Sequence, residues 1–274
     1  MKKILVVAYF LSILVLGKSQ TNLTETKIRI ITDSILSEGN LLFKYERAAW
    51  MSTDLARENG KVKKEFSSYL VYQRNDTIKA LILNRDGDCL YELSYFDNFY
   101  KPCDEIVKKR KLTELENRLL SVKQSVIGQI IENKYEVTCP EEFNLNFVLI
   151  PSESGYRFYI LTGTGKSDVI PFGNDYLFLA DDQGKVTSWK KIHSGLIPAY
   201  TKMEGDKIVM SMMHSHRRAE PFISATDICT FKLYAPLYDF NSFSVYSPAL
   251  SKTFTYYMDK NIVEIKDGLL NAEN

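Results

Sequence analysis

Two short patterns near residue 220 combine the side chains best suited to metal chemistry. His214-x-His216 is followed, after seven intervening residues, by Ser224-x-x-Asp227. Neutral imidazoles and carboxylates are common zinc ligands, and a site with three protein ligands keeps a fourth position for water, whose pKa the metal lowers. A hydroxyl beside that water, such as that of Ser224, could donate to an oxyanion. The patterns therefore predict a zinc site with His214, His216 and Asp227 as ligands.

A strand predicted from Lys207 to His216 explains how the two imidazoles come together. Side chains alternate between the two faces of a strand, so His214 and His216 point to the same side. The earlier members of that face are apolar, namely Ile208, Met210 and Met212. The imidazoles are therefore expected where a buried face emerges from the core, which limits the freedom of a metal ligand.

A short helix predicted from Ser224 to Tyr234 would bring Asp227 back towards the imidazoles. The same four residues also match an N-terminal capping box, in which Ser224 accepts from the third helical amide and the acidic residue there bonds back. In this alternative the histidines bond to neighbouring carbonyl groups. The remaining histidine of the chain, His193, is expected to pack or cap, or to hydrogen-bond near the site.

The spacing of these residues resembles the signature of the JAMM (JAB/MPN) metallopeptidases, which cut isopeptide and peptide bonds. The resemblance implies that His214, His216 and Asp227 bind zinc and that Ser224 stabilises the tetrahedral intermediate. It also implies an upstream glutamate as general base. Glu153, in a Ser-Glu-Ser-Gly loop, has an approximately suitable separation from the motif.

Two functions are compatible with these residues. One is an exported zinc-dependent metallohydrolase, a peptidase or isopeptidase acting on a peptide or protein substrate. The alternative is a non-catalytic binding module that keeps the JAMM-like fold and possibly the metal, because a clear general base is missing. A nucleic-acid partner is not expected, since the chain without its first 19 residues has a formal charge of +1 − 3 = −2.

Hydrophobic periodicity predicts an α+β protein with a mixed, mostly antiparallel sheet and flanking helices. Helices are expected over 22–37, 41–57, 104–135 and 224–234, with a break at Gly39-Asn40. Strands are expected at 70–72, 80–83, 90–93, 147–150, 156–161, 176–180, 185–192, 207–216, 243–246, 254–258 and 262–265. For the C-terminal half, the resemblance implies a JAB-like fold of the cytidine-deaminase-like kind.

The beginning of the chain indicates export. Met1-Lys2-Lys3 precedes an apolar run from Ile4 to Leu16 and a small-residue cleavage site ending at Ser19, the three parts of a signal peptide. An uncleaved membrane anchor is the alternative, but the run is shorter than a spanning helix needs. We therefore predict a signal peptide over 1–19, an N-terminal α+β region over 20–142 and a JAMM-like domain over 143–274, in a periplasmic or secreted protein.

The four cysteines are Cys89, Cys103, Cys139 and Cys229. An exported protein can form disulfides, and Cys89 with Cys103 is the most plausible pair, because the segment between them could fold back as a hairpin. Four free thiols are the alternative, since a chain of this length can bury a core without disulfides.

Overall fold

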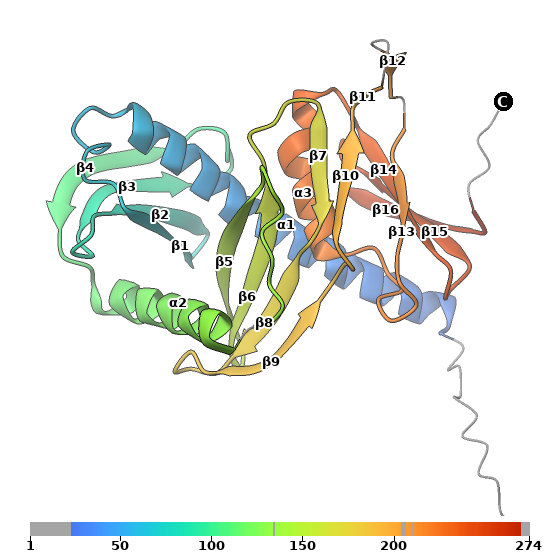
Figure 1. Ribbon diagram of the computed structural model, residues 1–274, viewed down its shortest axis with the longest axis horizontal. Helices are drawn as coiled ribbons and strands as arrows, with labels where there is room; N and C mark the ends of the chain where they lie inside the picture. The colour runs from blue at the N-terminus through green and yellow to red at the C-terminus, as the bar shows by residue number, and fades with distance from the viewer. Residues whose placement is uncertain (1–22, 134, 204–206, 210, 270–274) are drawn as a thin grey trace, which may run out of the picture.

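The computed structural model describes residues 23–133, 135–203, 207–209 and 211–269 (Figure 1). Within them, three α-helices accompany several open, mostly antiparallel sheets, which confirms the α+β class. The predicted signal peptide lies outside the described residues. Among the described helices, none combines the length and the apolar character needed to cross a membrane.

The N-terminal half contains a long helix, a four-stranded meander and a second helix. Their bounds are α1 (Glu25–Glu58), β1 (Ser68–Arg74), β2 (Thr77–Leu83), β3 (Cys89–Tyr95), β4 (Asp104–Arg110) and α2 (Glu114–Asn133). The meander is antiparallel in the order β1-β2-β3-β4. In Figure 1, α1 runs from this meander across the molecule to the C-terminal sheet.

The C-terminal half contains the remaining strands and one short helix. Their bounds are β5 (Asn144–Ser152), β6 (Gly155–Gly163), β7 (Val169–Gly173), β8 (Tyr176–Ala180), β9 (Val186–Lys191), β10 (Leu196–Tyr200), β11 (Lys202–Met203), β12 (Lys207–Ile208), β13 (Met213–Ser215), α3 (Ala225–Tyr234), the 3-10 helix η1 (Ala235–Leu237), β14 (Ser242–Ser247), β15 (Lys252–Tyr257) and β16 (Ile262–Asp267). The sheets have the orders β5-β6-β8-β9, β7-β10, β11-β12 and β13-β14-β15-β16. Only the β13–β14 pairing is parallel among the described strand pairs.

The predicted break at Gly39-Asn40 is wrong, because α1 continues through it. Gly39 is buried where α1 crosses α3. A Cβ atom at this position would lie 2.8 Å from Cβ of Ile228 and 3.1 Å from the carbonyl oxygen of Ala225. The glycine therefore permits close helix packing here rather than ending the helix.

The single helix predicted over 104–135 is also wrong, because its first part forms β4. The sequence signal for the true helix start is Thr113-x-x-Glu116, a capping box: the Glu116 amide donates to the Thr113 hydroxyl (3.3 Å), and the Thr113 amide donates to the Glu116 carboxylate (2.8 Å). Arg110, the last residue of β4, donates to Glu116 and to Glu92 of β3. These contacts fix β4 beside β3.

The strand predicted over 207–216 is shorter in the structure. It is divided into β12 and β13, and residue 210 lies outside the described residues.

The predicted Cys89–Cys103 disulfide is not formed, since both thiols are free. The Cys103 amide donates to the Ser94 carbonyl, so Cys103 lies beside Ser94. Ser94 is five residues along β3 from Cys89, an interval of about 16 Å. The two cysteines are therefore too far apart for a disulfide.

One hydrophobic core crosses the predicted boundary at residue 142. Leu42 of α1 and Tyr95 of β3 belong to the same buried cluster as Ile228 of α3 and Val245 of β14. A second cluster joins α2 to the β5–β6–β8 sheet and includes Val126. The long helix α1 thus contributes to the core beneath the C-terminal strands that carry the histidines.

Candidate metal centre

Three imidazoles and one carboxylate converge in the C-terminal half. The ligand atoms of His193, His214, His216 and Asp227 all lie within 4.8 Å of one another. Asp227 Oδ1 is 3.3 Å from Nε2 of both His193 and His214, and Asp227 Oδ2 is 3.1 Å from Nε2 of His216. The Nε2 atom of His216 lies 2.8 Å from that of His193 and 3.2 Å from that of His214.

The parallel pairing of β13 with β14 positions two of the imidazoles. His214 lies opposite Val245 in the strand register, and the His216 amide donates to the Tyr246 carbonyl at 2.9 Å. Met212 is buried whereas Met213 is exposed. The alternation holds from Met212 to His216, and the two histidines share the inward side. Met210 and the Ile208 side chain, also predicted on this face, lie outside the described residues.

Asp227 closes the capping box and also lies beside the histidines. The Ser224 hydroxyl accepts from the Asp227 amide at 3.0 Å, and the Ser224 amide donates to Asp227 Oδ2 at 2.9 Å, so the capping box is present. The Ser224 hydroxyl is also 2.7 Å from Oδ2. Because the cap holds the carboxylate through Oδ2, the other oxygen, Oδ1, faces His193 and His214.

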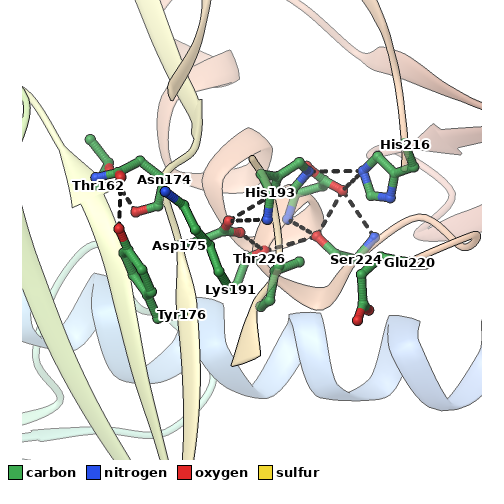
Figure 2. Close-up of polar contacts among 12 residues, drawn as sticks. Thr162, Asn174, Asp175, Tyr176, Lys191, His193, His216, Glu220, Ser224 and Thr226 are labelled. Carbon is green, nitrogen blue, oxygen red and sulfur yellow. Dashed lines mark hydrogen bonds and ion pairs between the residues drawn. The ribbon is translucent and has the colours of Figure 1, made fainter. Parts of the chain in front are cut away.

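His193 lies in the connection between β9 and β10, and Asp175 fixes its ring. Asp175 Oδ1 is 2.7 Å from His193 Nδ1, and the Thr226 hydroxyl bonds to the other carboxylate oxygen of Asp175. Figure 2 shows His193 between Asp175 on one side and His216 on the other. A carboxylate oxygen accepts, so Nδ1 carries a proton, and Nε2 faces Asp227 and His216. Nε2 has a free lone pair for a metal only when the ring gives up its second proton.

A close approach of two loops makes this placement possible. The Asn174 amide donates to the Gly195 carbonyl at 2.8 Å, and the Ile192 amide donates to the Asp175 carbonyl at 3.0 Å. Gly173 has a φ of +74°, and a Cβ atom there would lie 2.3 Å from the Gly195 carbonyl oxygen. Glycine is therefore required at the end of β7 for His193 to reach the centre.

The cluster is buried and strongly polarised. The side chains of His193, His214, His216 and Asp227 are 4%, 9%, 1% and 0% exposed. Burial would lower the pKa of His193, but Asp227 and Asp175 outweigh it and raise the pKa to about 11. Burial would likewise raise the pKa of Asp227, but the three imidazoles hold it well below its usual range. The centre thus favours a positive charge beside an ionised carboxylate.

The donor set fits a metal ion. Asp227 Oδ1 is buried and accepts no hydrogen bond from any residue that the structure describes, an arrangement that is costly unless a cation compensates it. Four atoms at tetrahedral angles and about 2.0 to 2.1 Å from a zinc ion lie about 3.3 Å from one another. For Asp227 Oδ1 and the three imidazole Nε2 atoms, the four separations given above are 2.8 to 3.3 Å, and all the ligand atoms lie within 4.8 Å of one another. The group could therefore hold a metal ion.

The structure does not bring Glu153 to this centre. Glu153 is exposed in the turn between β5 and β6. Further along β6, Ile160 pairs with Tyr176, the residue after Asp175. Ile160 is seven residues further along the chain than Glu153. That interval of strand is about 20 Å long. Conversely, the sequence did not identify His193 as a ligand or Asp175 as its partner.

Comparison with known proteins adds no relative: no protein-family model, no curated protein and no solved structure matches this chain. The chemistry of the centre itself is therefore the basis for a functional proposal.

Proposed function

We propose that this protein binds one zinc ion in a closed, four-coordinate centre and acts as a non-catalytic binding module. The observation that carries the proposal is His193. It adds a fourth side chain to the three predicted ligands, so the protein supplies a complete tetrahedral set. Structural zinc sites are closed in this way, whereas catalytic sites keep a position for water.

The donor types favour zinc over the hard cations. Three imidazoles and a single carboxylate oxygen suit zinc and other first-row transition ions, while calcium and magnesium prefer six or more oxygen ligands. Once bound, the ion would neutralise Asp227 and join the β9–β10 connection, β13 and α3. Asp175 would orient His193 and increase its basicity as a ligand, as carboxylates commonly do for metal-bound histidine.

Elemental analysis of the purified protein should find about one zinc per chain. His214→Ala and Asp227→Ala each remove a ligand and should abolish that loading. Ser224→Ala is the matched control within the motif, because its hydroxyl bonds to Asp227 Oδ2 but is not itself a proposed ligand, so metal should be retained. A metal-free wild type whose melting temperature does not respond to added zinc would overturn the proposal.

A JAMM-like zinc metallohydrolase is the second candidate. It is favoured by the convergence of His214, His216 and Asp227 beside the Ser224 hydroxyl. This function needs an open coordination position and therefore a centre in which His193 is not a ligand.

Cobalt substitution separates the two candidates. A centre with four protein ligands should give a tetrahedral cobalt spectrum that added azide does not change. His193→Ala should keep the metal with lower affinity and become sensitive to azide, because water takes the vacated position. Azide sensitivity of the wild type, together with an unchanged spectrum in His193→Ala, would favour the hydrolase.

A further inference from the structure

A second site lies away from the histidines, in a cavity of about 780 Å³ between the two halves of the chain. Small-molecule sites typically have volumes of about 300 to 1,000 Å³. The cavity is bordered by α1, α2, the start of β1, β5, β6 and α3. Its lining residues relevant to recognition are Glu46, Trp50, Tyr69, Lys123, Asn146 and Tyr234.

Two helices turn one face each towards this cavity. Glu46, Ala49, Trp50 and Thr53 of α1 recur at helical spacing, and so do Lys123 and its neighbours on α2. These faces carry aromatic and polar side chains, whereas the rim has an exposed ion pair between Arg57 and Asp54. The cavity thus has aromatic walls, a polar interior and charged side chains at its opening.

The interior contains two buried charged groups. Glu46 is 4% exposed, and its Oε2 atom has no hydrogen-bond partner among the described residues. Lys123 is 8% exposed; its ammonium donates to the Tyr69 carbonyl at 3.2 Å and lies 4.2 Å from the centre of the Tyr69 ring. No direct ion pair joins Glu46 to Lys123 within the described part of the chain.

Burial perturbs both groups in the direction of neutrality. It raises the pKa of Glu46 to about 7, against the opposing effects of Lys123 and Asn146. It lowers the pKa of Lys123 to about 8, against the opposing effect of Glu46. Leaving a buried acceptor unpaired is costly, and such groups gather at binding sites.

From this geometry we infer that the cavity binds a neutral, hydroxylated ring compound of mono- or disaccharide size. Glu46 Oε2 would accept from a ligand hydroxyl, and Lys123 has further N–H groups to donate to a ligand oxygen. Because the two protein charges are opposite, a neutral ligand adds no unpaired charge to the buried site. The Trp50, Tyr69 and Tyr234 rings supply apolar surfaces for the faces of the ring.

Ligand-observed NMR on the full-length mature protein tests this inference. The probes are glucose, N-acetylglucosamine and maltose, each at about 20 mM, since carbohydrate sites of modest area often bind in the millimolar range. Glucosamine and glucuronate are the charged counterparts. At least one neutral probe should show saturation transfer and should bind more tightly than its charged counterpart. Maltose binding with no glucose binding would identify a site for a longer sugar chain.

Variants establish where the probe binds. Glu46→Leu removes the acceptor and should weaken binding at least about tenfold. Glu65→Gln is the control, because it neutralises an exposed glutamate that is paired with Lys109 and does not line the cavity. If Glu46→Leu does not fold, Lys123→Met provides the same test from the donor side. Absence of binding by every neutral probe, tighter binding of a charged counterpart, or unchanged affinity in these variants would overturn the inference.

Discussion

At the scale of single residues, the centre depends on an acidic side chain that does not itself reach the ligand cluster. Asp175 bonds to His193 Nδ1 at 2.7 Å and receives a further bond from Thr226. The first bond keeps a proton on His193 Nδ1, so Nε2 faces the cluster and is the nitrogen available to a metal. The second bond ties that arrangement to the first turn of α3, which also carries Asp227. Asp175 is thus a positioning residue that links two of the proposed ligands.

Asp175→Asn should weaken metal binding without abolishing it. The amide oxygen can still accept from His193 Nδ1, but the negative charge that increases the ligand's basicity is lost, so affinity should fall about 10-fold to 100-fold. Competition with a chromophoric chelator measures this change. Asp168→Asn is the control, since Asp168 pairs with Lys202 at the surface. Equal affinities in the two variants would show that Asp175 has no positioning role.

The sequence allowed part of this centre to be predicted. His214, His216 and Asp227 are close in the chain, so strand alternation and one helix turn suffice to bring them together. His193 and Asp175 are brought in by the contact between the β7–β8 and β9–β10 connections, which no local pattern specifies. The missed residue also altered the expected chemistry, because under the proposed coordination a fourth side chain would take the position that three ligands leave for water.

At the scale of elements, Gly39 shows why one expected boundary was wrong. A glycine within a helical pattern suggests that the helix ends there, but Gly39 instead lies where α1 crosses α3. In β4 a strand was mistaken for part of a helix, because the charged segment that contains β4 and α2 has apolar residues at helical intervals. Tertiary contacts decided both cases, whereas strands with alternating or wholly apolar patterns, such as β2 and β6, were predicted correctly.

Gly39→Ala should destabilise the protein by about 1 to 3 kcal/mol, because overpacking at the helix crossing exceeds the roughly 1 kcal/mol gain in helix propensity. Gly128→Ala is the matched control. Gly128 also lies inside a helix, α2, but a Cβ atom there would meet nothing within 4 Å. That variant should be stabilised by about 0.5 to 1 kcal/mol. Chemical denaturation measures both changes, and a stabilised Gly39→Ala would contradict the packing argument.

At the scale of the whole molecule, the candidate metal centre belongs to the C-terminal end of the chain and the meander to the N-terminal end, and they pack against different parts of α1. The first turn of α3, which carries Asp227, packs against Gly39, whereas Tyr95 of the meander bonds to Ser52. The centre joins the β9–β10 connection, β13 and α3, whereas the meander is held by its own strand pairs and by contacts with α1 and α2. Both ends share one buried cluster. Metal binding is therefore expected to stabilise the C-terminal end most strongly and the meander only through the shared core.

Removing the metal tests this division. Stripping zinc with a strong chelator should lower the melting temperature, since a ligand present at 1,000 times its dissociation constant stabilises a protein by about 4 kcal/mol. That corresponds to about 10 °C for a domain of this size. Hydrogen exchange should accelerate in β13 and α3, where the ligands lie, and much less in β2 and β3, because local stability follows local contacts. His214→Ala should already exchange like the stripped protein and should not respond to the chelator. Equal acceleration at both ends would instead mean that the metal stabilises the molecule only as one cooperative unit.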